Sequence, residues 1–274
     1  MAELKLLARR IFQETISAID IPVAMHRKLW REGTKLCFEE ATVDLRGFAR
    51  VRVVAIGKAA HAMVEGLASL LTGEFAFSGV VTAPTPPLIA VEGMTYFVGG
   101  HPTPDEQSWK AAEAILDLLA ECDERTVVFF LVSGGGSAMV ELPLDSRQTL
   151  EDVRQLHRAL VTCGAPIDAM NTVRRHVSAV KGGRLAVAAG RATKITLAVS
   201  DVPVGKESAL SSGPTLQDPT TVADVRRVMA EFALREKLPA ALLRWMDEGH
   251  MPETPKEEHA AFRNAHFSLL LPKE

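Results

Sequence analysis

The stretch that most constrains the fold of this chain runs from Thr126 to Val140 and reads TVVFFLVSGGGSAMV. β-Branched and aromatic residues dominate its first half, and an apolar run of this length that ends in glycines is typical of a fully buried strand in a parallel sheet. A buried helix would need a longer run with fewer β-branched residues. We therefore expect a central strand that leads directly into a glycine-rich turn.

The glycine-rich turn comprises Ser133, Gly134, Gly135, Gly136 and Ser137, and we call it the SGGGS turn. Glycine adopts φ > 0 and brings the backbone close to a ligand. Successive N–H groups can therefore point at one anion, together with the N-terminus of a helix that starts near Ser137. A tight strand-to-helix turn without a ligand accounts for the glycines equally well.

Three familiar glycine motifs are excluded by the residues around this turn. The stretch lacks the Gly-Lys-Ser/Thr ending of a P-loop. Met139 occupies the position at which the dinucleotide-binding G-x-G-x-x-G motif and the hydrolase G-x-S-x-G motif each require glycine. Ser137 is therefore not predicted to be a nucleophile.

Strands and helices are expected to alternate along the chain. Besides the central strand, the patterns predict strands at residues 50–56, 77–82, 95–98 and 194–199, and helices at residues 59–71, 107–120, 149–161, 168–181, 221–232 and 239–247. Residues 2–19 are expected to form an N-terminal helical segment, and another helical stretch begins at Pro22. Residues 33–47 and 249–258 are expected to be polar connections. This alternation predicts an α/β fold with a mainly parallel sheet that helices cover on both faces.

Polar residues follow four of the expected strands directly: Lys58, His101, the SGGGS turn and Asp201. In open α/β sheets, ligands bind outside the carboxyl ends of the strands. A lysine, an anion-binding turn and an aspartate are groups that phosphoryl transfer needs, because that reaction depends on positioning and on cations near developing negative charge. We therefore predict a phosphate site at this edge of the sheet.

Each of these side chains also has a purely structural interpretation. Lys58 could neutralise a phosphate or be a solvated lysine at a helix start, where the helix dipole disfavours it. Asp201 could hold Mg²⁺ or orient an acceptor hydroxyl, and it could equally well cap a turn. His101 could contact the substrate or satisfy the backbone of its own loop.

Four basic residues form a further candidate anion-binding surface: Arg174, Arg175, Lys181 and Arg184. Arginine and lysine side chains bind carboxylates and phosphates. A charged helix face is also commonly just solvated. We expect two of the four to belong to the site.

The composition is that of an ordinary globular protein, which can bury a sizeable core as one large α/β domain or as two smaller ones. The net charge of −3 argues against a general surface for nucleic acid or anionic membranes, and no apolar run approaches a membrane span. Three widely spaced cysteines without a C-x-x-C indicate neither a disulfide framework nor structural zinc. A cytoplasmic location is the simplest expectation.

The chain resembles the N-terminal domain of the two-domain glycerate 2-kinases, whose C-terminal half is the leucine-rich MOFRL domain. Five segments in one order carry the resemblance: AIGKAA at 55–60, GGHPTPDE at 99–106, VSGGGSAMVELP at 132–143, MNTVRRHVSAVKGGRLA at 170–186, and SDVP with SSGPTLQDPTT within 200–221. They cover nearly the whole chain.

The resemblance implies transfer of the γ-phosphoryl group of ATP to the C2 hydroxyl of D-glycerate, with Mg²⁺, on a Rossmann-like three-layer α/β/α fold that often forms a homodimer. Lys58 would be the essential cation, and the SGGGS turn would hold the nucleotide phosphates. Arg175, Lys181 and Asp201 would line the cleft, with Asp201 as a metal ligand and His101 near the substrate.

The chain departs from the family pattern in two places. Val204 and Gly205 follow Ser-Asp-Val-Pro where the family has Gly-Asp, so one acidic residue that could serve a metal is missing. Residues 1–274 match only the N-terminal domain, and we expect activity to need a MOFRL-type partner chain, because the family's site lies between the two domains. The alternative is a non-catalytic nucleotide- or metabolite-binding protein, or an interaction module, derived from that domain.

Overall fold

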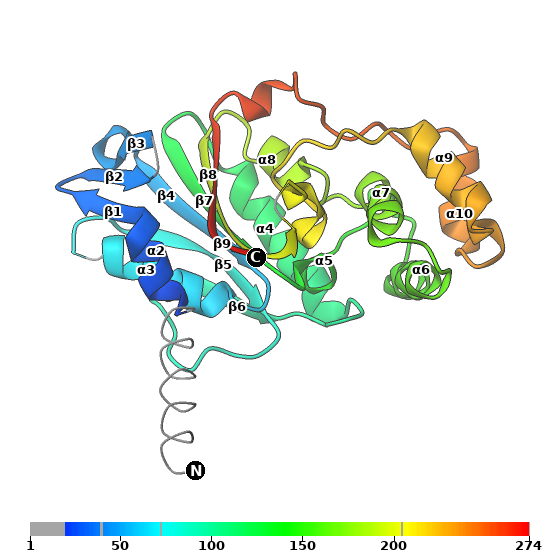
Figure 1. Ribbon diagram of the computed structural model, residues 1–274, viewed down its shortest axis with the longest axis horizontal. Coiled ribbons are helices and arrows are strands. Elements are labelled where there is room, and N and C mark those ends of the chain that lie inside the picture. Colours follow the sequence, from blue (N-terminus) through cyan, green and yellow to red (C-terminus); the bar gives the residue numbers. More distant parts are fainter. Residues whose placement is uncertain (1–19, 39–40, 72, 204, 274) are drawn as a thin grey trace, which may run out of the picture.

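The computed structural model describes residues 20–38, 41–71, 73–203 and 205–273. The helix expected at residues 2–19 lies outside this part of the chain. Within it, a six-stranded sheet forms the centre of the molecule, and a group of helices lies at one end (Figure 1). No helix among these residues combines the length and the apolar character that crossing a bilayer requires.

All neighbouring strands of the central sheet pair in parallel, in the order β6-β5-β4-β7-β8-β9. The strands are β4 (Arg50–Ile56), β5 (Phe77–Ala83), β6 (Met94–Val98), β7 (Thr126–Ser133), β8 (Thr193–Pro203) and β9 (Ala265–Lys273). Counted along the chain, this order is that of a doubly wound Rossmann-like fold, in which the direction of winding reverses between the first and fourth strands. The reversal lies between β4 and β7. Because every pairing in this sheet is parallel, the prediction of an α/β fold with a mainly parallel sheet is confirmed.

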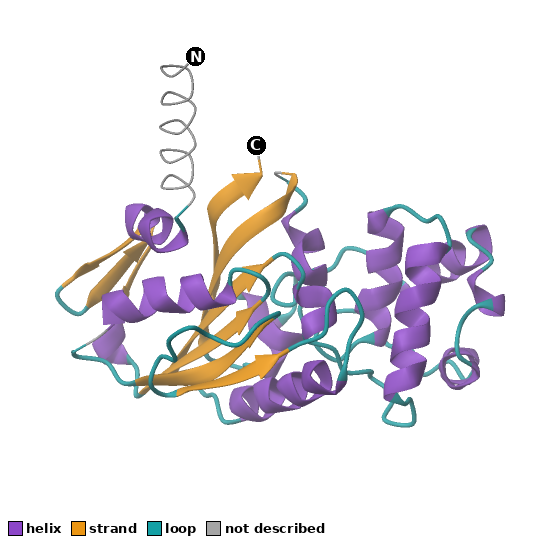
Figure 2. Ribbon diagram, turned by 90° about the horizontal axis from the view of Figure 1, so that it is seen from below, coloured by secondary structure: helices purple, strands orange, loops and turns teal. Residues whose placement is uncertain are grey.

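The sheet separates two hydrophobic cores, because successive side chains of a strand point to opposite faces. On one face, Val53 and Ala55 pack with α2 (Ile21–Lys28) and α3 (Ala60–Leu71). On the other, Val54 and Ile56 pack with α4 (Glu106–Ala120) and α8 (Arg184–Ala188). Figure 2 shows helices on both sides of the twisted sheet. The central strand β7 is buried along its whole length, as its apolar run predicts.

Four helices form a lobe of their own at the end of the molecule (Figure 1). They are α6 (Leu150–Thr162), α7 (Ile167–Val177), α9 (Val222–Glu231) and α10 (Ala240–Asp247). Their apolar faces meet in a third core that includes Leu160, Val173, Val225 and Leu242. These helices therefore pack mainly on one another rather than on the sheet.

Three segments differ from the sequence expectation. Residues 33–47 contain most of an antiparallel meander of β1 (Leu29–Glu32), β2 (Lys35–Phe38) and β3 (Ala41–Asp44) instead of a polar connection. Strand β9 was not expected. Helix α7 ends at Val177 instead of Lys181, because Ser178 leaves the helix to form a β-bridge with Pro143 and to donate a hydrogen bond to Glu141.

Candidate functional site

The turn after β4 and the turn after β7 meet where the winding of the sheet reverses. The backbone N–H of Lys58 donates a hydrogen bond to the carbonyl oxygen of Gly134 at 3.0 Å. The hydroxyl of Ser133 accepts from the N–H of Ala59 at 3.0 Å and lies 3.3 Å from the carbonyl oxygen of Ile56, to which it donates. Three hydrogen bonds therefore hold the two turns as one unit at the position where doubly wound folds bind ligands.

Close contact between these turns requires glycine at position 57. Gly57 has φ +114°, and a Cβ atom on it would lie 2.5 Å from both the carbonyl oxygen and the hydroxyl of Ser133. The hydroxyl belongs to the hydrogen-bonded junction and the carbonyl oxygen accepts a hydrogen bond from Ser211, so neither atom can move away without breaking a hydrogen bond. The absence of a Cβ atom at Gly57 therefore allows the junction to form.

Lys58 and His101 lie beside each other at this edge. The ammonium of Lys58 is exposed and has no hydrogen-bond or ion-pair partner among the described residues. Partial burial lowers the pKa of His101, and the positive charge of Lys58 lowers it further. The His101 ring also contacts the SGGGS turn, because a Cβ on Gly135 would lie 2.9 Å from its Cδ2. The structure thus brings together Lys58, His101 and the turn, and it keeps the His101 imidazole neutral at pH 7.

Ser211 and Ser212, which the sequence indicated only as part of the family-like segment SSGPTLQDPTT, complete the surroundings of the SGGGS turn. Ser211 donates a hydrogen bond of 2.7 Å to the carbonyl oxygen of Ser133, and the hydroxyls of Ser137 and Ser212 are 2.9 Å apart. Ser211 and Ser212 have φ of 48° and 61°. Left-handed backbone at non-glycine residues costs about 1–3 kcal/mol each and is concentrated at functional sites. Sequence patterns do not reveal such strain.

Helix α5 (Gly136–Met139) starts within the SGGGS turn, as expected, but it is only one turn long. Its N-cap, Gly135, has φ 87°, a conformation that glycine adopts readily. The short helix fixes the direction of the turn and adds little dipole. Phosphate binding here would therefore depend on the backbone of the turn and on nearby side chains.

Two of the predicted basic residues are engaged in buried ion pairs. Arg175 Nη1 donates to Asp218 Oδ1 at 2.9 Å, and Arg175 Nη2 donates to the carbonyl oxygen of Ser208 at 2.8 Å. Lys181 Nζ donates to Glu141 Oε2 at 2.6 Å and is 1% exposed. The structure does not bring their charged groups to the open edge with Lys58, so their visible role is to stabilise the surroundings of the turn.

Glu141 is the centre of a buried polar network directly after α5. Its carboxylate accepts hydrogen bonds from Lys181, Ser178 and His157, the last at 3.0 Å. Burial alone would raise the pKa of Glu141, but the charge of Lys181 and the hydrogen bonds of its partners outweigh burial and lower the pKa to about 2. Glu141 is therefore ionised at neutral pH.

Asp201 belongs to β8, two residues beyond Val199, where the pairing of β8 with β7 ends. Its side chain lies outside what the structure describes. Among the described residues, no three His, Cys, Asp or Glu side chains gather in a way that could hold a metal ion. Mg²⁺ in phosphoryl-transfer enzymes is held by one or two carboxylates together with substrate phosphates, so a preformed cluster is not required.

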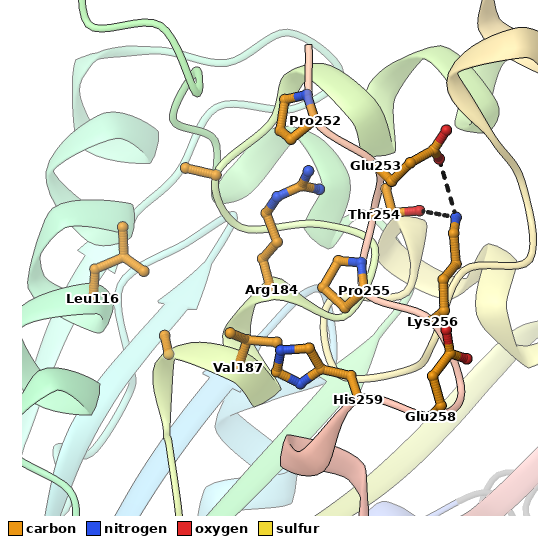
Figure 3. A pocket seen from close by; sticks show the side chains of 12 residues that line it. Leu116, Arg184, Val187, Pro252, Glu253, Thr254, Pro255, Lys256, Glu258 and His259 are labelled. Carbon is orange, nitrogen blue, oxygen red and sulfur yellow. Dashed lines mark hydrogen bonds and ion pairs between the residues drawn. The ribbon is translucent and has the colours of Figure 1, made fainter. Parts of the chain in front are cut away.

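A separate pocket of about 590 Å³ lies on the α8 side of the molecule (Figure 3). The segment of residues 252–259 crosses over α8 there, and Arg184 points from the helix towards Pro252 and Glu253. Lys256 Nζ hydrogen-bonds to Thr254 and forms an ion pair with Glu253. Residues 249–258, expected to be a linker, therefore form an irregular segment that is fixed to the fold.

The fold and the junction define a doubly wound α/β protein with a candidate phosphate site at its switch point. The family described as a domain of unknown function, DUF4147, matches residues 7–247. The chain belongs to this family.

Glycerate kinases are among the relatives. A protein of Pyrococcus horikoshii named glycerate 2-kinase is 34% identical over 93% of this chain. A crystal structure of glycerate kinase from Thermotoga maritima superposes with a TM-score of 0.80 and 30% identity over 99% of this chain. An Agrobacterium vitis protein with the provisional name hydroxypyruvate reductase is 35% identical over 92% of the chain. The match covers 57%, 59% and 53% of these proteins, respectively, so the chain spans little more than half of each.

Proposed function

We propose that this chain carries the nucleotide-phosphate part of a glycerate 2-kinase site, in which the γ-phosphoryl group of ATP is transferred to the C2 hydroxyl of D-glycerate. The hydrogen-bonded junction between Lys58 and Gly134 carries the proposal, because it sets a free cation beside a glycine turn at the switch point. The names of the relatives support the reaction class.

In this proposal the SGGGS turn binds the phosphates through its backbone, and Lys58 neutralises charge on the transferred group. Transfer of a phosphoryl group spreads negative charge over its oxygens, so a cation fixed nearby lowers the barrier. The neutral His101 beside Lys58 adds a hydrogen-bonding group without further positive charge. Mg²⁺ would enter with ATP and neutralise its phosphates, and Asp201 is the proposed protein ligand.

The relatives contain a further stretch that these 274 residues do not match. We therefore propose that full turnover requires that stretch, whether it is continuous with these residues or supplied as a complementing chain, since an open edge leaves the reacting groups in water. We also propose a homodimer, which light scattering would test. A cytoplasmic location agrees with the three free cysteines.

Hydride transfer is a second candidate, because two of the relatives are named for a hydroxypyruvate reductase. That reaction needs a nicotinamide dinucleotide, whose usual binding motif has glycine where this chain has Met139. A non-catalytic nucleotide-binding protein is a third candidate. Oxidation of NADH by hydroxypyruvate would favour the reductase, and nucleotide binding without turnover under any complementation would favour the third.

The test is an assay of ADP and 2-phosphoglycerate formed from Mg·ATP and D-glycerate, with and without the complementing chain. We expect turnover in the complemented wild type and its loss in Lys58→Ala. Turnover that Lys58→Ala leaves intact would remove Lys58 from the mechanism. A wild type that neither turns over nor binds ATP would contradict the proposal.

A further inference from the structure

Arg174 on α7 is connected to the SGGGS turn through hydrogen-bonding side chains. Its Nη1 lies 3.5 Å from Asn171 Oδ1, which also accepts a hydrogen bond from the hydroxyl of Ser212 at 3.0 Å. The hydroxyl of Ser212 lies 2.9 Å from that of Ser137 in the turn. Two side chains therefore separate the guanidinium of Arg174 from the proposed phosphate site.

No described carboxylate forms an ion pair with this guanidinium, although the charge of Glu141 acts on it at longer range. Arg174 is half-buried, and its Nε, like that of Arg175, is buried without a hydrogen-bond partner. The nearby carboxylate of Glu141 is already bound by Lys181 and by Ser178, each at 2.6 Å. The interior behind the turn thus holds two cationic side chains, Lys181 and Arg174, for one carboxylate.

The next residue on α7, Arg175, shows the usual arrangement of a buried arginine, which is an ion pair with a carboxylate. Arg175 is buried against Asp218, with 2.9 Å between Nη1 and Oδ1, so its charge is compensated. A buried charge without a partner is strongly unfavourable. Burial lowers the pKa of Arg174, and the charge of Glu141 offsets this effect only in part. Among the described residues, Arg174 is therefore a half-buried cation without an ion-pair partner, as expected of a group that binds an anionic ligand.

We propose that Arg174 binds the carboxylate of the hydroxy-acid substrate beside the SGGGS turn, an inference that rests on the proposed kinase function. A guanidinium presents a planar fork that matches a carboxylate, whereas the ammonium of Lys58 is a point charge suited to a phosphate. The connection through Asn171 and Ser212 keeps the two anion sites next to each other. Arg174 would thus orient the substrate so that its C2 hydroxyl faces the nucleotide.

The first arm of the test compares the melting temperatures of two ligand-free variants, in each of which one of two neighbouring arginines is replaced by methionine. Arg174→Met should melt at the same temperature as the wild type or above it, because it removes a half-buried charge that has no ion-pair partner among the described residues. Arg175→Met should melt well below the wild type, because it strands Asp218. A loss of stability in Arg174→Met as large as that in Arg175→Met would show a structural role and overturn the inference.

The second arm measures ligand binding by calorimetry in the wild type and Arg174→Met, with the complementing chain present in both. The variant should bind D-glycerate about tenfold to a hundredfold more weakly, as expected for the loss of hydrogen bonds to a charged group. Glycerol, which lacks the carboxylate, should bind both proteins equally poorly. Inorganic phosphate and ADP should bind both proteins equally well.

The outcomes separate this inference from the proposed function. Unchanged affinity of Arg174→Met for D-glycerate would overturn only the role of Arg174. A loss of affinity for phosphate or ADP instead of D-glycerate would contradict the assignment to the carboxylate. A wild type that binds neither ADP nor D-glycerate would overturn the proposed function, and the inference with it.

Discussion

The backbone of Lys58 donates a hydrogen bond of 3.0 Å to the carbonyl oxygen of Gly134, and this contact joins two turns that are 76 residues apart in the sequence. The turns follow β4 and β7, the neighbouring strands at which the winding of the sheet reverses. The exposed ammonium of Lys58 is thereby held beside the SGGGS turn. Substitutions in either turn should therefore affect the other.

Gly57→Ala should destabilise the protein more than an alanine at a comparable left-handed glycine elsewhere. Gly164 has φ +81° and an open surrounding, so Gly164→Ala should cost only the conformational penalty of about 1–2 kcal/mol. Gly57→Ala adds a contact of 2.5 Å with Ser133, which should cost about 1–3 kcal/mol more. Urea unfolding measures both, and equal losses would contradict the close approach of the two turns.

Lys58→Ala should raise the pKa of His101. Burial is the larger cause of the lowered pKa and stays in the variant, whereas the repulsion by the Lys58 charge disappears. The shift should therefore be partial and towards the ordinary value. NMR titration of the His101 ring measures it, with Lys237→Ala in the exposed segment after α9 as the control. An unchanged pKa in Lys58→Ala would show that the two side chains are not neighbours.

Lys181→Met should destabilise the protein by about 3–5 kcal/mol at pH 7, because it leaves the carboxylate of Glu141 buried without its cation. Lys206→Met, which removes an exposed ion pair with Asp168, should cost less than about 1 kcal/mol. Urea unfolding of both variants at pH 7 is the measurement. Similar losses in the two variants would contradict the burial of the Glu141–Lys181 pair.

The same ion pair predicts a pH dependence. The pKa of Glu141 lies at about 2 in the folded state, below its ordinary 4.5, so its contribution to stability is complete above pH 4.5 and is lost as the pH falls towards 2. In Lys181→Met the pKa of Glu141 should rise, so the loss of stability on acidification should be smaller. Unfolding free energies measured between pH 5 and pH 3 test this. Parallel curves for the wild type and the variant would contradict it.

Much of the fold can be predicted from the sequence, because buried parallel strands are short continuous apolar runs and the helices between them have regular apolar spacing. The pair of Thr149 and Asp152 illustrates this: its spacing predicts a capping box, and the structure contains both reciprocal hydrogen bonds. Alternation also placed Lys58, His101 and the SGGGS turn at one edge of the sheet. These features depend on local sequence alone.

The remaining features depend on contacts between distant segments. The role of Arg175 depends on Asp218, 43 residues away, and the end of α7 depends on Glu141 and Pro143, so no pattern within the helix indicates either. Strands β1 to β3 are only four residues long each and only partly apolar. Gly33 and Thr34 join β1 and β2 in a two-residue turn, and a glycine in such a turn is a sequence signal for a hairpin. The polar residues around it favoured a connection instead.

The most direct test of the central claim is a ³¹P NMR assay of phosphoryl transfer from Mg·ATP to D-glycerate in the presence of the complementing chain. We expect a 2-phosphoglycerate signal with the wild type and with the surface control Lys237→Ala, and no signal above background with Lys58→Ala. Equal product formation by Lys58→Ala and the wild type, or ATP hydrolysis with no phosphorylated glycerate, would contradict it.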